Sequence, residues 1–546
     1  MKINNIDKGG VELHGRNSII FIGMACLLFP VSAGTVFASG ASAGTSLVTK
    51  NGPIKGVRAK GVYAYKGIPY AKAPVGDLRF APPQDAEPWT EVRDCTKYGP
   101  IIPQWLTVSL RLDNTEQSED ALILNVWTPS APKKNDKLPV YVFIHGGGYA
   151  FGSGNEKDYD GTGFAQDGVV AVTINYRLST LGFFASNETY NQYGTTGNWG
   201  ILDQIKALEW VRDNIAEFGG DPDQVTIGGE SAGSLSVSAL VLSPLAKGLF
   251  RSAIMESGAI LAAQAMASRG DLQKSIEQSQ ELAGIFGASD TAEGLAYLRR
   301  LDGYVLNYLS PFSLDQTKPA TPFYLTPVFD GVALPKDPVA ALREGNYNKV
   351  NLLLGFNHDE GTLLIPPTVD AGFYENFGSR MAGENWPVVA ERFPVDEHNT
   401  AAQRAQQMLA YAWFTASEKV FADALASNNR VFMYNFNFVA QGDPQSAALG
   451  AYHTAELPYV FNNIALKGFV SAENEKLAKE MHTRWINFIK NGDPNVGITP
   501  PTVAQWPQYN PENPDVIFFD NEITTGPLPN QEDFDFIAHI LYGVGN

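Results

Sequence analysis

The chain has 546 residues, 44% of them hydrophobic, so it holds enough apolar material for a large buried core. Length alone does not fix the number of domains, because single α/β enzymes often exceed the usual domain size. The formal net charge of −18 at pH 7 would repel a polyanion, which argues against nucleic acid as a partner.

The first 43 residues have the pattern of an export signal peptide. Basic residues precede an apolar run at 18–28, and small residues follow this run up to Ala43. A retained membrane anchor is the alternative, but Pro30 follows the run closely and leaves it well short of the roughly 20 residues that a spanning helix needs. We therefore expect cleavage after Ala43, export to the periplasm or the medium, and no stable insertion into a membrane.

The two cysteines predict no structural disulfide. Cys26 lies in the apolar run, and Gly23 stands where a lipoprotein signal would have Leu or Val, so we expect no lipid attachment. After cleavage only Cys95 remains, and a single cysteine cannot close an intramolecular disulfide. Cys95 lies in a polar stretch without a neighbouring histidine or glycine-rich turn, so we interpret it as an incidental thiol rather than a nucleophile.

A β-hairpin is predicted after the signal, followed by the pattern of a parallel sheet. Alternating apolar residues at 46–50 and 53–57 flank Asn51 and Gly52, a pair that suits a tight turn. Further along the chain, short apolar runs recur, separated by stretches long enough for helices, at 139–144, 169–175, 225–227, 350–356 and 430–436. This alternation predicts an α/β fold with a central, mostly parallel sheet flanked by helices.

A glycine turn, HGGGY at 145–149, follows the predicted strand 139–144 directly. Glycines leave the backbone bare, so its N–H groups can approach a bound group closely. Gly147 and Gly148 are the best placed of these donors to stabilise a developing oxyanion. A merely flexible turn is the alternative interpretation.

One amphipathic helix is clear between residues 201 and 218. Its apolar residues repeat at helical spacing, and Gly219 and Gly220 mark its end. From 262 to about 325 the chain is more polar and helix-like, which predicts an insertion packed over an edge of the sheet. The sequence shows no internal repeat or linker, so we expect a single domain over 44–546, preceded by the signal peptide at 1–43.

A nucleophile is predicted at Ser231. Two Gly-x-Ser-x-Gly matches occur, but the one around Ser42 lies in the signal and follows no strand. The match at 229–233 comes after the apolar run 225–227 and before a helix-like stretch, which is the order of strand, turn and helix that a nucleophilic serine requires. At the start of that helix, the N–H of Ala232 is free to donate to an oxyanion.

Two carboxylates compete for the role of the acid that orients the base. The predicted strand 350–356 leads almost directly to Asp359 and Glu360. Either could accept a hydrogen bond from an imidazole and stabilise the cation that forms in the reaction. Their spacing does not separate them, and an exposed acidic turn is the alternative for both.

The base is predicted by elimination among seven histidines, of which two belong to the signal and to the glycine turn. A chain order of nucleophile, acid and base leaves His398, His453, His482 and His539. His398 lies in a polar run, His482 in an amphipathic stretch and His539 near the C-terminus. His453 lies in a loop after the predicted strand 430–436, which is the usual position of this base.

These motifs resemble those of the type B carboxylesterase family, which includes the cholinesterases. The likeness covers essentially the whole chain after the signal. FGGDPDQVTIGGESAG at 218–233 resembles the nucleophile signature of the family, SEDALILNVWTP at 118–129 its second signature, and KGIPYAKAPVGDLRFAPP at 66–83 its N-terminal signature. The resemblance implies the α/β-hydrolase fold with helical insertions.

The resemblance also implies roles for single residues. Glu360 in the DEG triplet is then the catalytic acid, and His453 in GAYHTAELPYVF is the base. Glu230, beside the nucleophile, is structural, and Ser257 is similar to a serine that supports the acid. The positions that match the oxyanion hole are Gly147, Gly148 and Ala232.

The chain departs from the family pattern at one disulfide. Ala121 stands where the second signature has cysteine, and Ile102 stands where its partner would fall. The loop 102–121, which in the family helps to roof the active-site gorge, is then not stapled. Cholinesterase specificity is therefore not carried over to this chain, and the missing disulfide favours a bacterial origin.

Together these features predict a serine carboxylesterase that hydrolyses small-molecule carboxylic esters through a Ser-His-Glu triad and an acyl-enzyme, with no metal or organic cofactor. An amidase or transacylase with the same triad is the alternative, because pocket shape selects the leaving group and the acceptor. A non-catalytic binding module is a further alternative, since fold alone does not imply activity. Adhesion members of the family lack the serine, whereas Ser231 is present here.

Overall fold

The computed structural model describes residues 46–105, 110–129, 131, 133–265, 270–308, 325–468, 470–498 and 504–544. These residues belong to one compact unit. The predicted signal peptide and its cleavage after Ala43 lie outside the described residues. None of the helices in these ranges has both the length and the apolarity that a membrane crossing requires.

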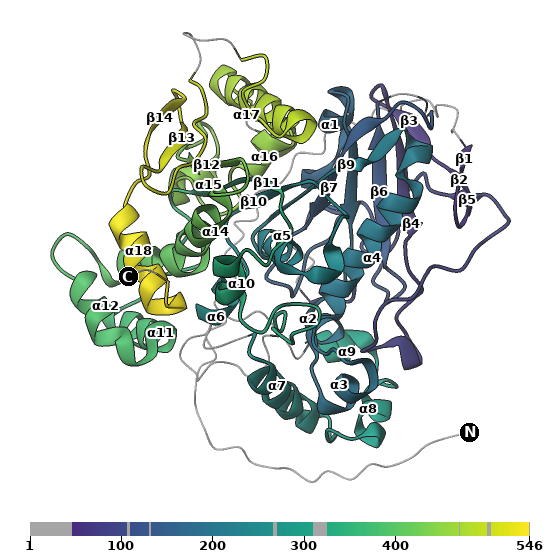
Figure 1. The fold of residues 1–546 in the computed structure, drawn as a ribbon, viewed down its shortest axis with the longest axis horizontal. Coiled ribbons are helices and arrows are strands. Elements are labelled where there is room, and N and C mark those ends of the chain that lie inside the picture. Colours follow the sequence, from purple (N-terminus) through teal and green to yellow (C-terminus); the bar gives the residue numbers. More distant parts are fainter. Residues whose placement is uncertain are drawn as a thin grey trace. The chain divides into compact units, whose positions relative to one another are not determined.

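Strands and helices alternate along most of the described chain (Figure 1). The strands are β1 (Ser46–Thr49), β2 (Gly52–Lys55), β3 (Val57–Ala59), β4 (Val62–Pro69), β5 (Arg93–Asp94), β6 (Ile123–Thr128), β7 (Leu138–Ile144), β8 (Val170–Ile174), β9 (Gly220–Glu230), β10 (Ser252–Glu256), β11 (Asn351–Asn357), β12 (Val431–Phe436), β13 (Asp515–Phe519) and β14 (Thr524–Pro527). The α-helices are α1 (Thr162–Gln166), α2 (Ser179–Phe183), α3 (Asn187–Tyr193), α4 (Trp199–Asn214), α5 (Ala232–Leu242), α6 (Ala262–Ala265), α7 (Leu272–Ile285), α8 (Ala292–Leu298), α9 (Gly303–Tyr308), α10 (Pro338–Glu344), α11 (Ala371–Ala382), α12 (Trp386–Arg392), α13 (Ala401–Leu409), α14 (Ala416–Ala426), α15 (Pro444–Leu449), α16 (Leu457–Val460), α17 (Ala472–Asn491) and α18 (Gln531–Tyr542).

The main sheet has the strand order β14-β13-β12-β11-β10-β9-β7-β8-β6-β4-β3, and the hairpin β1-β2 pairs separately with β5. Every neighbouring pair from β13 to β8 is parallel, whereas the pairs at both ends are antiparallel. The predicted mostly parallel sheet is therefore confirmed. Because the carboxyl ends of parallel strands share one edge, the loops after β7, β9, β10 and β11 meet at that edge.

The core divides between the two faces of the sheet because successive strand side chains point to opposite sides. Along β7, Val140 and Val142 belong to the same core cluster as residues of α4, α5 and α14, whereas Tyr141 and Phe143 belong to the cluster that includes residues of α1, α16 and α17. Figure 1 shows α4 and α5 in front of the central strands. Since helices cover both faces, the central strands are apolar throughout, which explains why they stand out in the sequence as continuous apolar runs.

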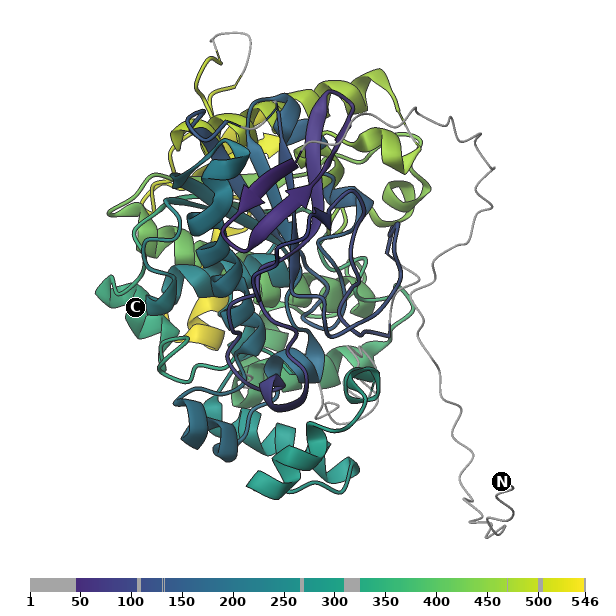
Figure 2. The ribbon, with the colours of Figure 1, turned by 90° about the vertical axis from the view of Figure 1, so that its right-hand side faces the viewer.

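The predicted N-terminal hairpin is present, but its turn lies one residue earlier than expected (Figure 2, purple). Thr49 pairs with Gly52, so Lys50 and Asn51 form the turn and Gly52 begins β2. A Cβ at Gly52 would lie 2.3 Å from the backbone oxygen of Trp89. The close approach of Trp89, rather than the turn, therefore requires glycine at this position.

The other predicted elements are present with different ends. The amphipathic helix is regular as α4 only to Asn214 and continues as a 3-10 helix over Ile215–Phe218, up to Gly219 with φ of 86°. The short apolar run at 225–227 is the centre of a longer strand, because β9 already pairs with β7 at Gly220. Polar residues at the ends of these elements hide their true length in the sequence.

The insertion after residue 262 is helical as predicted, and its helices α7 and α9 contact the segment from α2 to α3, which follows the carboxyl end of β8. The hydroxyl of Thr180 donates to the carbonyl of Leu306 at 2.9 Å, and the N–H of Ala185 donates to the hydroxyl of Ser279 at 3.0 Å. Buried polar groups on both sides thus find their partners across this contact.

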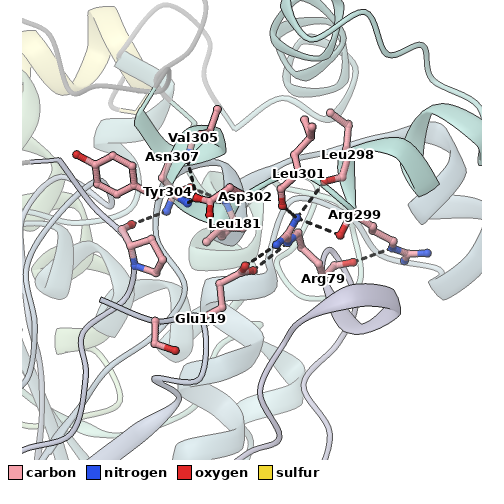
Figure 3. A network of polar contacts seen from close by, with 12 residues as sticks. Arg79, Glu119, Leu181, Leu298, Arg299, Leu301, Asp302, Tyr304, Val305 and Asn307 are labelled. Carbon is pink, nitrogen blue, oxygen red and sulfur yellow. Dashed lines mark hydrogen bonds and ion pairs between the residues drawn. The ribbon is translucent and has the colours of Figure 1, made fainter. Parts of the chain in front are cut away.

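A buried arginine ties the insertion to two segments of the N-terminal half (Figure 3). The guanidinium of Arg79 is paired with the carboxylate of Glu119. Its Nη1 also donates to the backbone carbonyls of Leu298, Arg299 and Leu301, at 3.0, 3.1 and 2.6 Å. A planar guanidinium can serve all of these acceptors at once, so one side chain fixes the end of α8 against the segments around residues 79 and 119.

Candidate active site

Ser231 lies at the sharp turn between β9 and α5, in a backbone conformation that few side chains adopt (φ 57°, ψ −125°). Its N–H donates to the carbonyl of Glu256 at 2.9 Å. Space requires the glycines on either side: a Cβ at Gly229 would lie 2.5 Å from the backbone of Gly233. A Cβ at Gly233 would lie 2.0 Å from the carbonyl oxygen of Ile144. The turn therefore holds Ser231 at the carboxyl edge of the sheet, at the N-terminus of a helix.

The glycine turn after β7 packs directly against Ser231, because a Cβ at Gly146 would lie 3.1 Å from the Cβ of Ser231. Gly147 and Gly148 have φ of 101° and 59°, a region that favours glycine. Within the described residues, the N–H groups of Gly147, Gly148 and Ala232 donate to no acceptor. They are therefore available to an oxygen that gains negative charge.

His453 and Glu360 form a buried pair. Nδ1 of His453 lies 2.5 Å from Oε2 of Glu360, and Nε2 lies 3.2 Å from Oε1 of Glu230, the neighbour of Ser231. Phe414 stacks on the imidazole, with ring centroids 4.6 Å apart. The structure thus brings the predicted nucleophile, base and acid together, although Nε2 is paired with Glu230 rather than with the hydroxyl of Ser231.

Asp359, the other candidate acid, has different partners. Its Oδ2 accepts the N–H of Ala451 at 2.8 Å, and its Oδ1 lies 2.9 Å from Nδ1 of the partly exposed His358. Asp359 therefore holds the loop that carries His453, whereas Glu360 contacts the imidazole itself. The two adjacent carboxylates thus differ only in their tertiary partners, which is why their spacing in the sequence does not separate them.

The remaining late histidines lie elsewhere. His398 is exposed beside Glu397, and His539 lies on α18. His482 is buried on α17, with Nδ1 2.6 Å from the carbonyl oxygen of Val460. These settings agree with the surface and helical positions that the sequence indicates for them.

Ser257 lies between the strand of the nucleophile and the strand of the acid. It has φ of 64°, and its N–H donates to the carbonyl of Gly355 on β11 at 2.9 Å. Its hydroxyl is buried and has no hydrogen-bond partner among the described residues. The support for Glu360 that the resemblance implies is thus not a direct hydrogen bond here.

Three further buried carboxyl groups, which the sequence did not single out, surround this pair: Glu256, Glu418 and Glu456. Burial lowers the pKa of His453, but the carboxylates of Glu230 and Glu360 outweigh burial and raise this pKa to about 9. Burial also raises the pKa of Glu456 to about 7. The site therefore favours an imidazolium on His453 between the carboxylates of Glu230 and Glu360.

Asn357 orients the acid and was also not predicted. Its N–H donates to Oε1 of Glu360 at 2.8 Å, and its amide donates to the carbonyl of Tyr452 at 2.8 Å and to Oε2 of Glu456 at 2.5 Å. A single side chain thus joins the turn of the acid to the loop of the base. The sequence holds a signal for both partners: Asn357 ends the strand before the acid, and Glu456 follows His453 by three residues.

Two further observations in the part of the chain that the structure describes concern ligand groups and the single cysteine. No group of three or more His, Cys, Asp or Glu side chains there is arranged to hold a metal ion. Cys95 is buried, and burial raises its pKa to about 12, so the reactive thiolate is scarce at neutral pH.

Comparison with known proteins gives consistent matches over most of the chain. A family model described as the carboxylesterase family matches residues 43–537. A para-nitrobenzyl esterase of Bacillus subtilis (strain 168) is 36% identical over 509 residues, which cover 89% of this chain and 97% of that protein. Carboxylesterase 1D of Rattus norvegicus is 37% identical over 491 residues, covering 83% and 84%. A solved structure of a PNB esterase superposes with a TM-score of 0.77 at 33% identity, covering 90% of this chain and 99% of the other.

Proposed function

The chain belongs to the carboxylesterase family, and we propose that it hydrolyses carboxylic esters with Ser231 as nucleophile, His453 as base and Glu360 as acid. The family resemblance and the α/β-hydrolase fold predicted from the sequence are confirmed by the family model and the superposed esterases. The observation that supports the mechanism most is the contact of 2.5 Å between the buried side chains of His453 and Glu360. The imidazole of His453 also contacts Glu230, which lies at the end of the strand before Ser231.

In the first step, the hydroxyl of Ser231 attacks the carbonyl carbon of the ester, and Nε2 of His453 takes its proton. The Glu360 carboxylate remains ionised and stabilises the imidazolium through Nδ1–H. The carbonyl oxygen, now negative, accepts hydrogen bonds from three backbone groups, the N–H of Gly147, Gly148 and Ala232. The imidazolium then protonates the leaving oxygen, the C–O bond breaks, and the acyl group stays on Ser231.

In the second step, water takes the place of the alcohol. His453 removes a proton from the water, whose oxygen adds to the acyl carbon, and the imidazolium returns a proton to Ser231 as the acid leaves. In the structure Nε2 faces Glu230 instead of Ser231. This arrangement is compatible with the mechanism, because catalytic hydrogen bonds often align only when substrate is bound.

The acyl acceptor and the leaving group are part of this proposal. Relatives of the chain are named esterases and carboxylesterases, which favours esters and water over amides and other acceptors. An amidase or a transacylase would use the same three residues, since pocket shape makes the choice. A matched ester and amide with one acyl group separate the alternatives: we expect the ester to react much faster and the amide to remain intact.

We also propose that residues 1–43 direct export and are removed after Ala43, as basic, apolar and small-residue segments in this order indicate. Expression of the full chain in a bacterium should yield a protein beginning at Gly44 outside the cytoplasm. The mass of the N-terminal peptide from each cell fraction tests this. An intact N-terminus confined to the cytoplasm would contradict it.

A serine-reactive phosphonate tests the nucleophile directly. The reagent should add once to the folded protein, and peptide mass spectrometry should place the adduct on Ser231. Ser231→Ala should remain unlabelled, whereas Ser257→Ala, a change of the nearby serine with the unpaired hydroxyl, should still be labelled. Labelling of another residue at equal rate in the Ser231→Ala protein would assign the nucleophile elsewhere.

A further inference from the structure

Two consecutive polar residues at the start of α14 contact the loop that follows β10. The hydroxyl of Ser417 accepts the N–H of Ala259 at 3.1 Å, and Oε1 of Glu418 accepts the N–H of Gly258 at 3.0 Å. All of these residues are buried, so neither N–H has water as an alternative partner. Helix α14 therefore supplies two of the acceptors that hold this loop.

This loop, residues 256–260, joins the nucleophile to the strand of the acid. β10 lies between β9 and β11, and the carbonyl of Glu256 accepts the N–H of Ser231 at 2.9 Å. On the other side, Ser257 donates its N–H to β11. Ser257 and Gly258 have φ of 64° and 119°, so the loop has a conformation that its surroundings must maintain.

The helix after the nucleophile holds the same loop from the other side. The hydroxyl of Ser234 donates to the carbonyl of Gly258, and the hydroxyl of Ser238 accepts the N–H of Ile260 at 2.7 Å. Side chains from α5 and α14 thus meet at Gly258 and its neighbours. A shift of this loop would move the acceptor of the Ser231 N–H, and with it the nucleophile.

The surroundings of Glu418 favour the neutral acid. The side chain is fully buried, and the titratable groups that face it from neighbouring elements are Glu256 on β10, Glu360 after β11, Tyr434 on β12 and Glu456 after the loop of the base. The cation next to it on its own helix, Lys419, is paired with Asp423 and Asp535. Burial raises the pKa of Glu418 well above its usual range, the hydrogen bond from the N–H of Gly258 opposes this shift, and the neighbouring carboxyl groups add to it.

Two buried atoms without partners also support a protonated Glu418, independently of the neighbouring charges. Oε2 of Glu418 and the hydroxyl of Ser257 are both buried and have no hydrogen-bond partner among the described residues. A protonated carboxyl group has a donor on one oxygen, and a hydroxyl can accept. Glu418 is bonded to the N–H of the residue next to Ser257, so a donor and an acceptor are brought into one buried region.

We propose that Glu418 is a positioning residue for the triad: as a neutral carboxylic acid it accepts the N–H of Gly258 and holds the 256–260 loop on which Ser231 depends. This inference rests on the proposed mechanism through Ser231. Glu418 acts by geometry and contributes no charge to the base. The role is accordingly filled by any side chain of the same shape that offers a neutral acceptor.

Three variants test this role. Glu418→Gln keeps the shape, an acceptor for Gly258 and a donor in place of the carboxyl proton. Glu418→Met keeps the approximate volume but removes both. Lys419→Met is the matched control, because it changes the next residue on the same helix and breaks ion pairs with Asp423 and Asp535 rather than a contact with the loop. Active sites are counted by phosphonate titration, so that turnover refers to folded enzyme only.

The amide variant should retain kcat within about twofold and leave the acid limb of kcat/KM against pH in place, because it reproduces a neutral acid. The methionine variant should lose about tenfold or more in kcat with little change in KM, because a buried N–H is left unpaired and the loop is released. Lys419→Met should lower the unfolding temperature and leave kcat per active site unchanged.

Two results would overturn the inference. An acid limb displaced to lower pH in Glu418→Gln would show that the charge of the Glu418 carboxylate acts on the base. This test with the amide variant applies even if the methionine variant does not fold. Wild-type kcat in Glu418→Met would show that the loop does not need this acceptor. A Ser231→Ala protein in the same series distinguishes the two proposals. Turnover by Ser231→Ala would refute the mechanism. No turnover by Ser231→Ala together with wild-type kcat in Glu418→Met would refute only the role of Glu418.

Discussion

The contacts on the two nitrogens of His453 decide when this residue can act as a base. Glu360 binds Nδ1 at 2.5 Å and Glu230 lies 3.2 Å from Nε2, and together they raise the pKa of the imidazole to about 9 despite its burial. A base must be neutral to take the proton of Ser231. We therefore expect kcat/KM to rise with pH through an acid limb well above the ordinary range of histidine.

Glu230→Gln should move this acid limb to lower pH by about one unit, because it removes a carboxylate that stabilises the imidazolium. The measurement is kcat/KM for one ester from pH 5 to pH 10. Glu397→Gln, a change at an exposed carboxyl group far from the site, is the control and should not move the limb. An unchanged limb in Glu230→Gln would mean that Glu230 does not act on His453.

Residues with local signals were predictable from the sequence, and residues that depend on packing were not. Ser231, Gly147 and Gly148 belong to short motifs that can be recognised in the sequence. These motifs require glycine because neighbouring atoms leave no room for a side chain at glycine positions of the turns. Glu256 lies at the end of a strand and Glu418 lies on a helix, and neither belongs to a recognisable sequence motif. Only the tertiary fold buries them, so nothing in their neighbourhood along the chain indicates a place beside the base.

Among the elements, continuous apolar runs predicted the central strands, whereas β10 was not predicted. Its five residues end in Glu256, which reads as a polar break in the sequence. In the structure this carboxyl group is buried and accepts the indole N–H of Trp485 from α17 at 2.9 Å. The partner lies more than two hundred residues away in the chain, and a pattern of local hydrophobicity cannot reveal it.

The attachment of the helical insertion through Arg79 can be tested by stability. Arg79→Met should cost about 3 kcal/mol of unfolding free energy, because it leaves the carboxylate of Glu119 and three backbone carbonyls without their buried donor. Urea unfolding measures this. Lys50→Met breaks the more exposed ion pair with Asp213 and should cost less than about 1 kcal/mol. Equal losses in both variants would contradict the account of Figure 3.

Over the whole molecule, the buried carboxyl groups link stability to pH. Glu256, Glu418 and Glu456 all keep their protons to a higher pH in the folded chain than in the unfolded chain. His453 does the same, with a pKa of about 9 instead of 6.5. Through these groups the folded state binds more protons, so their contribution to the free energy of unfolding falls as pH rises. For Glu456 this occurs between pH 4.5 and about 7, and for His453 between 6.5 and about 9. Burial lowers the pKa of His145 to about 4, so this group acts in the opposite direction below pH 6.5.

The unfolding temperature should accordingly decrease as pH increases from 6.5 to 9. Glu456→Gln should flatten the part of this decrease that lies below pH 7, because it removes one of the linked protons. Calorimetry at a series of pH values measures both curves. A wild-type unfolding temperature that increases over this range would show that these groups are not protonated in the folded state.

The composition and motifs of the whole chain identified the family and the sheet, but they could not assemble the site. Nucleophile, acid and base come from segments near residues 231, 360 and 453, and the sheet order alone brings their strands together. The path of the insertion also follows from contacts between distant segments, such as that of Thr180 with Leu306, which the sequence pattern does not specify. The sequence therefore indicates which residues are chemically suited to the site, whereas the distances between them are known only from the folded structure.

The proposed mechanism requires that ester hydrolysis proceeds through Ser231. Its most direct test is the hydrolysis of p-nitrophenyl esters, from acetate to dodecanoate, by wild type and by Ser231→Ala of verified fold. We predict turnover by the wild type, with a burst of p-nitrophenol when deacylation is slow, and a loss of at least about a thousandfold in the variant. Comparable turnover by the two proteins would contradict the mechanism.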